Sequence, residues 1–285
     1  MFGRAEERSA GSRRERGPLP GFGLAMGTSL LYLGLLVLLP LATVVLKSAE
    51  IPLDRLIEVV ASPRALASYR LTFGAALLGA LVNLVFGVLV AWVLVRYRFP
   101  GRRLVDGLVD LPFALPTAVA GIALAAVYAP NGWLGAPLAA LGFKVAYTPW
   151  GVVVALTFIG LPFVVRSVQP VLADLEPALE EAAATLGAGR WTTLRRVVLP
   201  EIAPAATTGF VLALARGLGE YGSVIFIAGN LPMKSEITAL LIMVQLEQYD
   251  YAAATGIALV FLIASFALLL LLNGLSRRGR MAGAA

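Results

Sequence analysis

Two residues of opposite charge, Arg216 and Glu220, lie inside the long apolar stretch 202–228. They are four residues apart, so a helix would place both side chains on one face. A charge inside a lipid bilayer is costly and marks a functional site by default. Either Arg216 helps an anion to pass, or the pair neutralises itself and fixes a gate or a helix contact. We favour the second interpretation, because a carboxylate beside the path would repel an anion.

The residues that follow this pair are small or polar. They are Tyr221, Ser223, Gly229 and Asn230. Small side chains let neighbouring helices approach each other closely. Together with the charged pair, these residues form the predicted translocation path or gate.

A second group of charges lies near residue 106. Asp106 and Asp110 are four residues apart, and Arg102 and Arg103 precede them. Paired carboxylates can relay protons, but carboxylates beside exposed arginines more often form solvated ion pairs. We therefore expect a solvated pair at the membrane surface rather than a proton relay.

The segment 174–200 has the pattern of two short helices separated by a turn. Asp174 is placed to cap the first helix, and Pro177 falls in its first turn. An apolar stripe follows at helical spacing, and Gly187 and Gly189 permit a left-handed stop. The fixed positions of the pattern are Glu181-Ala182-Ala183-x3-Gly187-x11-Leu199-Pro200.

Each residue type in this pattern has a physical reason. Two alanines let another backbone approach closely, glycine makes the turn, and proline restarts the next helix. The segment is therefore suited to contact a second protein. The plainer alternative is an alanine-rich helix that lies on the membrane surface.

The elements that must position these residues are membrane-spanning helices. Of the 285 residues, 59% are hydrophobic and only 14% are charged, and the mean hydropathy is +0.85. Soluble proteins carry about 25% charged residues, so a soluble enzyme is excluded. The apolar stretches do not alternate as barrel strands do. They predict six helical spans, at about 21–46, 71–95, 108–129, 145–166, 202–228 and 251–275.

The composition also limits the chemistry. The chain has no Cys and no His, which removes thiolate chemistry and the commonest metal ligand. The phosphate-binding pattern G-x4-G-K-[S/T] is missing as well. We expect no catalytic residue, cofactor or metal site in this chain, so any energy that it uses must come from a partner.

Basic residues are concentrated on one side of the predicted membrane. They lie in the tail 1–20, after the second span, after the fourth span and in the tail 276–285. Because basic residues favour the cytoplasmic side, both termini and the segment 174–200 are predicted to be cytoplasmic. The net charge of +6 then belongs to the inner membrane face and its lipids, not to a nucleic-acid site. On the outer side, the loop 47–70 and the segment 236–248 are expected to form short surface helices.

The pattern from Glu181 to Pro200 resembles the EAA loop of the permease subunits of ABC importers. In that family the loop is a coupling helix that docks into a groove of the ATPase subunit. Further stretches resemble the sulfate/thiosulfate importer permeases, the T subunit in particular. They are GEYGSV at 219–224, AGNLPMK at 228–234 and LEQYDYA at 246–252.

This resemblance implies an all-α membrane protein with the six-helix, MetI-like fold of type I ABC importer permeases. It implies a subunit that moves sulfate or thiosulfate across the bacterial inner membrane and is not itself an enzyme. The implied partners are a W-type sister permease, a periplasmic or extracellular sulfate-binding protein, and two cytoplasmic ATPases that bind ATP and Mg.

Three other functions stay open. A related permease would carry another oxyanion, such as molybdate. A gradient-driven secondary transporter would need intramembrane ionisable relays in repeated halves, and only Arg216 and Glu220 qualify. A membrane anchor for a signalling complex would leave the organised segment 174–200 without a specific role.

Overall fold

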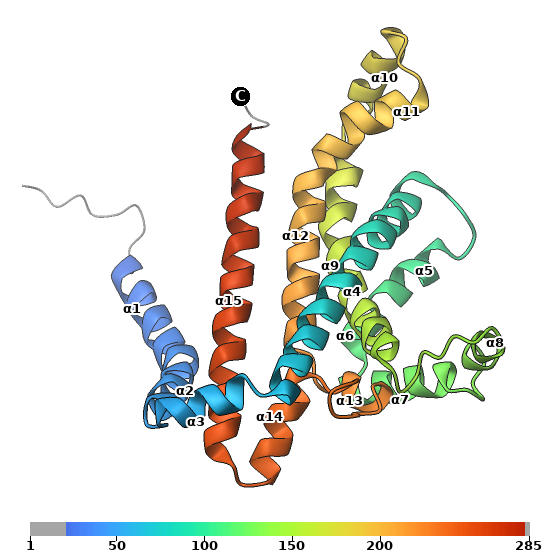
Figure 1. The fold of residues 1–285 in the computed structure, drawn as a ribbon. Coiled ribbons are helices and arrows are strands. Elements are labelled where there is room, and N and C mark those ends of the chain that lie inside the picture. The colour runs from blue at the N-terminus through green and yellow to red at the C-terminus, as the bar shows by residue number, and fades with distance from the viewer. Residues whose placement is uncertain (1–20, 283–285) are drawn as a thin grey trace, which may run out of the picture. The chain divides into compact units, whose positions relative to one another are not determined.

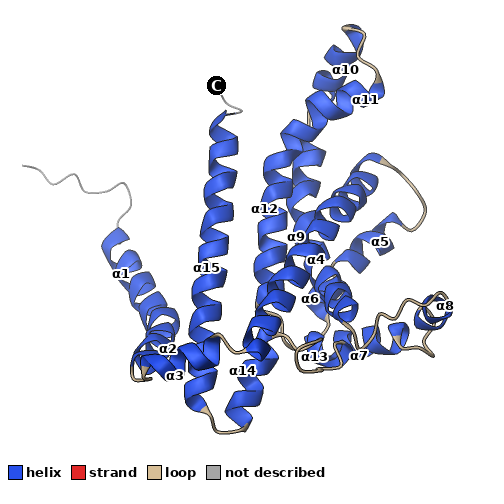
Figure 2. Ribbon diagram, viewed as in Figure 1, coloured by secondary structure: helices blue, strands red, loops and turns tan. Residues whose placement is uncertain are grey.

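The computed structural model describes residues 21–282, and all regular structure within this range is helical (Figures 1 and 2). The predicted N-terminal tail 1–20 lies outside the described residues. The predicted C-terminal tail begins inside helix α15 (Tyr251–Ala282), which continues to residue 282. The chain divides into two compact units, Met1–Lys47 and Ser48–Ala285.

The first unit is built from one long apolar helix. It consists of α1 (Phe22–Leu33), a π-helical turn η1 (Gly34–Leu38) and α2 (Leu39–Ala49), whose last residues belong to the second unit. The run Phe22–Ala49 is long and apolar enough to cross a membrane. It corresponds to the first predicted span.

Three helices pack side by side to form the core of the second unit: α4 (Pro63–Arg96), α9 (Pro149–Asp174) and α12 (Leu199–Leu218) (Figure 1). Helix α15 packs against α12. Glycines bring the core helices into close contact, because a Cβ added at Gly87 would lie 2.8 Å from Val164 Cβ. Small residues at such contacts are the usual means by which membrane helices associate.

Proline and hydroxyl residues set where two core helices begin. Pro63 opens α4 behind Ser62, whose side chain accepts a hydrogen bond from the Ala65 amide. Pro149 opens α9 behind Thr148 in the same way. Proline is favoured there because the first turn of a helix leaves its N–H groups unpaired. Helix α4 thus begins eight residues earlier than the predicted second span at 71–95.

The third predicted span, 108–129, is not one continuous helix. It consists of the end of α5 (Arg102–Val109), the short α6 (Leu111–Ala114) and α7 (Thr117–Tyr128), and α8 (Gly135–Ala140) follows. Proline restricts the residue before it, and Leu115, before Pro116, is extended with φ −85° and ψ 136°. By length and composition, α7 is an apolar helix too short to cross a membrane alone.

The fifth predicted span, 202–228, also ends early. Helix α12 stops at Leu218, and a turn leads to the single turn of α13 (Val224–Ile227). The helices in the described residues that are long and apolar enough to cross a membrane therefore number five. They are Phe22–Ala49, Pro63–Arg96, Pro149–Asp174, Arg190–Leu218 and Tyr251–Gly274.

Short helices gather at the two ends of the second unit (Figure 1). At one end, α10 (Pro177–Thr185), α11 (Arg190–Thr193) and a π-helical turn η2 (Leu194–Val198) connect α9 to α12. Helices α4 and α15 also finish toward this end. At the other end lie α3 (Leu53–Val60) and α14 (Thr238–Glu247), in the segments for which short helices are predicted.

Candidate functional site

The segment 174–200 forms a helix, a tight turn and a second helix beyond the ends of α9 and α12 (Figure 1). The turn is a Schellman motif. The Gly187 amide donates to the Ala184 carbonyl at 2.9 Å, and the Ala188 amide donates to the Ala183 carbonyl at 3.0 Å. Gly187 has φ +79°, the left-handed conformation that favours glycine. The sequence prediction of a stop at Gly187 is confirmed.

The start of the first helix differs from the prediction. Asp174 does not cap α10; it is the last residue of α9. The residue that precedes α10 is Glu176, and Pro177 occupies the first helical position as predicted. The linker between α9 and α10 is therefore only two residues long, Leu175 and Glu176.

The fixed residues of the pattern lie on an accessible surface. Glu181 and Ala182 are exposed, Ala183 is half-buried, and Leu199 and Pro200 are exposed at the start of α12. Large apolar side chains beside them are also open, since Leu186 is 88% and Trp191 70% exposed. Apolar side chains held outward on a short, defined helix suit contact with a partner.

One ion pair connects this segment to the core. Arg96, the last residue of α4, donates a hydrogen bond to Glu180 of α10. The Arg96 guanidinium also lies over the Trp92 ring, with Cζ 5.3 Å from the ring centroid. Both members of the ion pair are partly exposed, so the pair orients α10 without burying it.

The predicted pair Arg216–Glu220 is formed. Arg216 Nη1 lies 2.5 Å from Glu220 Oε2. The other carboxylate oxygen, Oε1, accepts hydrogen bonds from the Ser223 amide at 2.8 Å and from its hydroxyl at 3.0 Å. Glu220 is buried, so its charge is compensated by all three contacts. This geometry favours the packing or gating interpretation, because both carboxylate oxygens hold the turn after α12.

The turn after α12 packs directly against α7. A Cβ added at Gly121 would lie 2.3 Å from the Ser223 carbonyl oxygen, and one added at Gly222 would lie 2.2 Å from Thr117 Oγ1. Tyr221, directly before Gly222, is half-buried. Any movement of α7 must therefore displace this turn.

Gly229 and Asn230 close the same segment. Their φ angles are +74° and +54°. A Cβ at Gly229 would lie 2.8 Å from Tyr147 Cβ, and the Asn230 side chain donates to the Ile225 carbonyl at 2.8 Å. Both residues thus set the backbone path of residues 219–230. We call this segment, which includes α13, the turn 219–230. Their role in a translocation path stays a prediction.

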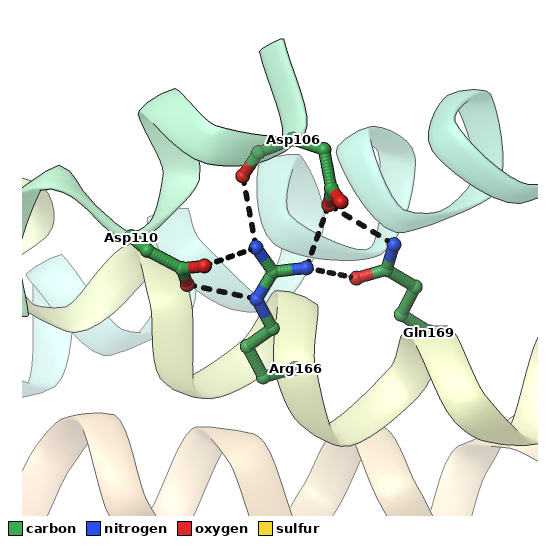
Figure 3. Close-up of polar contacts among 4 residues, drawn as sticks. All are labelled: Asp106, Asp110, Arg166 and Gln169. Atoms are coloured by element: carbon green, nitrogen blue, oxygen red, sulfur yellow. Dashed lines mark hydrogen bonds and ion pairs between the residues drawn. The ribbon is translucent and has the colours of Figure 1, made fainter. Parts of the chain in front are cut away.

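Asp106 and Asp110 keep 41% and 47% of their side-chain surface exposed, as expected of a solvated pair. Their partner differs from the expectation, because both bind Arg166 of α9 rather than Arg102 or Arg103 (Figure 3). Arg166 Nε and Nη2 donate to the two Asp110 carboxylate oxygens at 2.8 and 2.5 Å. Nη1 donates to Asp106 Oδ1 and to Gln169 Oε1, both at 2.6 Å, and Nη2 also reaches the Asp106 carbonyl at 2.8 Å. These hydrogen bonds hold the pKa of Asp106 below its ordinary value. We call these four residues the Arg166 cluster.

A further polar group at the opposite end was also missed. Arg64 makes two hydrogen bonds of 2.7 Å to Glu236, whose side chain is only 2% exposed. Beside it, the Thr238 amide donates to Thr72 Oγ1 at 2.9 Å. These contacts hold α14 against α4. We call Arg64, Glu236, Thr72 and Thr238 the α14 anchor.

The predicted docking segment 174–200 and the predicted translocation path or gate around Arg216 lie far apart. Leu199 and Pro200 begin α12, while Arg216 lies near its end, and a helix rises about 1.5 Å per residue. The separation along the helix is therefore about 25 Å. Within the described residues, α12 joins the accessible segment directly to the turn 219–230.

Comparison with known proteins places these features in a family. Residues 83–278 match the model of the family described as "Binding-protein-dependent transport system inner membrane component". The chain is 52% identical over 263 residues to the sulfate transport system permease protein CysT of Escherichia coli (strain K12), covering 92% of this chain and 95% of that protein. It is 50% identical over 244 residues to the protein of the same name from Synechococcus elongatus, covering 86% and 88%.

Solved structures share the fold at low sequence identity. A bacterial ABC transporter involved in the import of the acidic polysaccharide alginate aligns with a TM-score of 0.72 and 18% identity, over 90% of this chain and 94% of that chain. The MetNI methionine ABC transporter in an inward-facing conformation aligns with a TM-score of 0.57 and 18% identity, over 76% and 96%. The all-α, MetI-like fold is thereby confirmed.

Proposed function

This chain belongs to the family of binding-protein-dependent transport system inner membrane components, and we propose that it is the permease subunit of an ATP-driven importer of sulfate. The strongest support is its 52% identity to a sulfate transport system permease protein over 92% of the chain. The accessible segment 174–200 gives such a subunit a surface for the protein that supplies energy. We propose thiosulfate as a second substrate, on the resemblance of the stretches around Glu220 and Asn230.

The orientation in this proposal follows from charge. The end that carries α10 also carries Arg96, Arg190, Arg195 and Arg196. Basic residues favour the cytoplasmic side of a membrane. The segment 174–200 then faces the cytoplasm, and α3 and α14 face the outside.

The proposed partners follow from this orientation. Two cytoplasmic ATPases, which bind ATP and Mg, contact α10 and the turn at Gly187. A W-type sister permease completes the pathway within the membrane. A periplasmic or extracellular sulfate-binding protein delivers the anion to the outer end.

In the proposed mechanism, ATP-driven closure of the ATPases moves α10. Because the linker to α9 is two residues long, and η2 joins α11 to α12 without a break, α9 and α12 move with it. Their movement reaches the turn 219–230 and opens the path outward. ATP hydrolysis returns the helices to the inward state. The helices thus have two states, inward and outward, and ATP bound to the distant ATPases shifts the balance between them.

The Arg216–Glu220 pair fits a path that binds its cargo weakly. Arg216 is neutralised by Glu220, so it does not offer a full positive charge to sulfate. A transporter must release its cargo, and tight binding within the path would slow that release. Selection of the anion therefore rests with the binding protein.

Reconstitution tests the proposal. The chain is assembled in vesicles with the proposed sister permease and ATPase, and radiolabelled sulfate is supplied with the binding protein. We expect uptake that requires ATP and is insensitive to ionophores, with competition by thiosulfate. Uptake that requires an ion gradient would identify a secondary transporter, and molybdate uptake without sulfate uptake would identify a different oxyanion permease.

A further inference from the structure

The Arg166 cluster uses the full hydrogen-bonding capacity of one side chain. Every N–H group of the Arg166 guanidinium donates to Asp106, Asp110 or Gln169 (Figure 3). The Gln169 amide also donates to Asp106 at 3.2 Å. The planar guanidinium thus fixes both the distance and the angle between its partners, as two-point arginine contacts do.

This cluster is the main polar connection between α5 and α9. Arg166 and Gln169 belong to α9, while Asp106 lies within α5 and Asp110 directly after it. The large apolar side chains of α5 do not hold it to the core, because Leu104 is 68% and Leu108 53% exposed. Only Val109 of α5 is buried. The position of α5 therefore depends on the charged contacts.

The two helices lead to different working parts of the molecule. From Arg166, α9 continues to Asp174 and through a short linker into α10. From Asp110, the chain continues through α6 into α7, which packs against the turn 219–230 at Ser223 and Gly222. The Arg166 cluster thus lies between the accessible segment and the turn held by Glu220.

We propose that Arg166 is a positioning residue that clamps α5 to α9, so that movement of α10 is passed through α5, α6 and α7 to the turn 219–230. The inference rests on the proposed transport function. It adds to that function a second connection, parallel to the direct one through α12. Without the clamp, α5 would be held to α9 only by the buried Val109 and through α6, where the Phe113 ring packs on Phe163 of α9, so the turn would receive only part of the motion.

The main test compares Arg166→Gln with Arg103→Gln in the reconstituted complex. Arg103 is an exposed residue of α5, the helix that the clamp holds, and lies outside the cluster. For Arg166→Gln, we expect the anion transported per ATP hydrolysed to fall at least tenfold, with the same amount of assembled complex. Arg103→Gln should keep the ratio of the unchanged protein. An unchanged ratio in Arg166→Gln, or uptake that falls only in step with the amount of assembled complex, overturns the clamp.

A charge exchange keeps the test decisive if Arg166→Gln does not assemble. In the double variant Arg166→Asp with Asp110→Arg, an ion pair between α5 and α9 can form again. We expect this variant to recover assembly and part of the transport per ATP, relative to each single change. Recovery of assembly without recovery of that ratio assigns the cluster a purely structural role and overturns the inference.

A distance measurement separates this inference from the transport function itself. The chain has no Cys, so spin labels can be placed on Gly107→Cys in α5 and Ala173→Cys in α9 without background. We expect the label distance to be the same with and without a non-hydrolysable ATP analogue, and to change on analogue binding only when Arg166 is replaced by Gln. A distance that changes equally in both proteins overturns the clamp. Absence of sulfate uptake by the unmodified complex would instead overturn the proposed function.

Discussion

The segment 174–200 and the α14 anchor lie at opposite ends of the second unit and differ in how far their side chains are buried. At the end that carries α10, Leu186 and Trp191 are open, and the Arg96–Glu180 pair is itself partly exposed. At the other end, α14 is held by the buried Glu236 carboxylate and by hydrogen bonds between Thr72 and Thr238. The segment 174–200 leaves apolar side chains uncovered, whereas the α14 anchor has paired its polar groups within the chain.

This difference indicates where partners supply the missing contacts. A surface whose polar groups are already paired within the chain can bind a partner without changing shape. A short helix with open apolar side chains gains most when a partner covers it. We therefore expect changes at the α14 anchor to reduce stability, and changes in the segment 174–200 to reduce transport.

The largest effect on stability is expected from Glu236→Ala. Removing one partner of a buried ion pair costs about 3–5 kcal/mol. Arg64 keeps 33% of its side-chain surface exposed, so we expect the lower end of that range. The measurement is the unfolding midpoint of the purified protein in detergent. Glu247→Gln, an exposed carboxylate at the end of α14, is the control and should leave the midpoint unchanged.

An unchanged unfolding midpoint in Glu236→Ala would contradict the contrast between the two regions, because the α14 anchor would then not stabilise the fold.

The largest effect on transport is expected from Gly187→Val. A side chain in the left-handed conformation costs about 1–2 kcal/mol, and a β-branched side chain lies at the upper end. No atom lies within 4 Å of the added Cβ, so the effect comes from the backbone alone. We expect the Schellman turn to open, sulfate uptake to fall at least about tenfold, and the unfolding midpoint to stay the same.

Gly189→Val provides the matched control for this change. Gly189 has φ −71° and also has open space around its Cβ position, so valine is tolerated there. Equal loss of uptake in both variants would show that the shape of the turn at Gly187 is not what matters.

A smaller effect is expected from Glu180→Gln, which removes the ion pair with Arg96. Partly exposed ion pairs are worth about 0.2–1 kcal/mol. Helix α10 should then sample more orientations, and its affinity for the ATPase should fall by about two- to fivefold. Titration of the ATPase onto the permease pair measures this. A loss as large as that of Gly187→Val would mean that the pair, not the turn, defines the docking surface.

The smallest effect is expected from pH. The hydrogen bonds of Arg166 lower the pKa of Asp106 from its ordinary value of 3.8. A lowered pKa means that the stabilisation is complete above the ordinary value and is lost as the pH falls through the lower one. The contribution of Asp106 to the unfolding midpoint should therefore be complete and independent of pH between about pH 6 and 8. In Arg166→Gln the acid-induced loss from this carboxylate should shrink, and an unchanged acid profile would contradict this assignment.

Much of the fold could be predicted because the strongest signals are local. Long uncharged stretches predict membrane helices, and those around Ala80, Leu156 and Ala264 all lie in helices of the structure. The turn at Gly187 could be predicted because the left-handed conformation strongly favours glycine. The Arg216–Glu220 pair follows from helical spacing alone.

The rest depends on contacts between distant parts of the chain. Arg166 and Asp110 are 56 residues apart, and Arg64 and Glu236 are 172 apart. No rule of sequence spacing predicts contacts between residues so far apart. The sequence also offers several carboxylates as possible partners for each arginine. The early end of α12 was missed for a related reason, because the apolar run Val224–Ala228 after the turn was counted as part of the same span. What ends the helix there is the set of contacts made by Glu220 and Ser223.

The π-helical turn η2 has a consequence for how the length of this chain can vary. Such a turn accommodates one additional residue inside an otherwise regular helix. Deleting one residue between 194 and 198 should restore ordinary winding and keep Trp191 pointing in the same direction. The same deletion within α12 would rotate everything before it by about 100° about the helix axis. Natural relatives that are one residue shorter in this region are therefore expected to place the gap at η2.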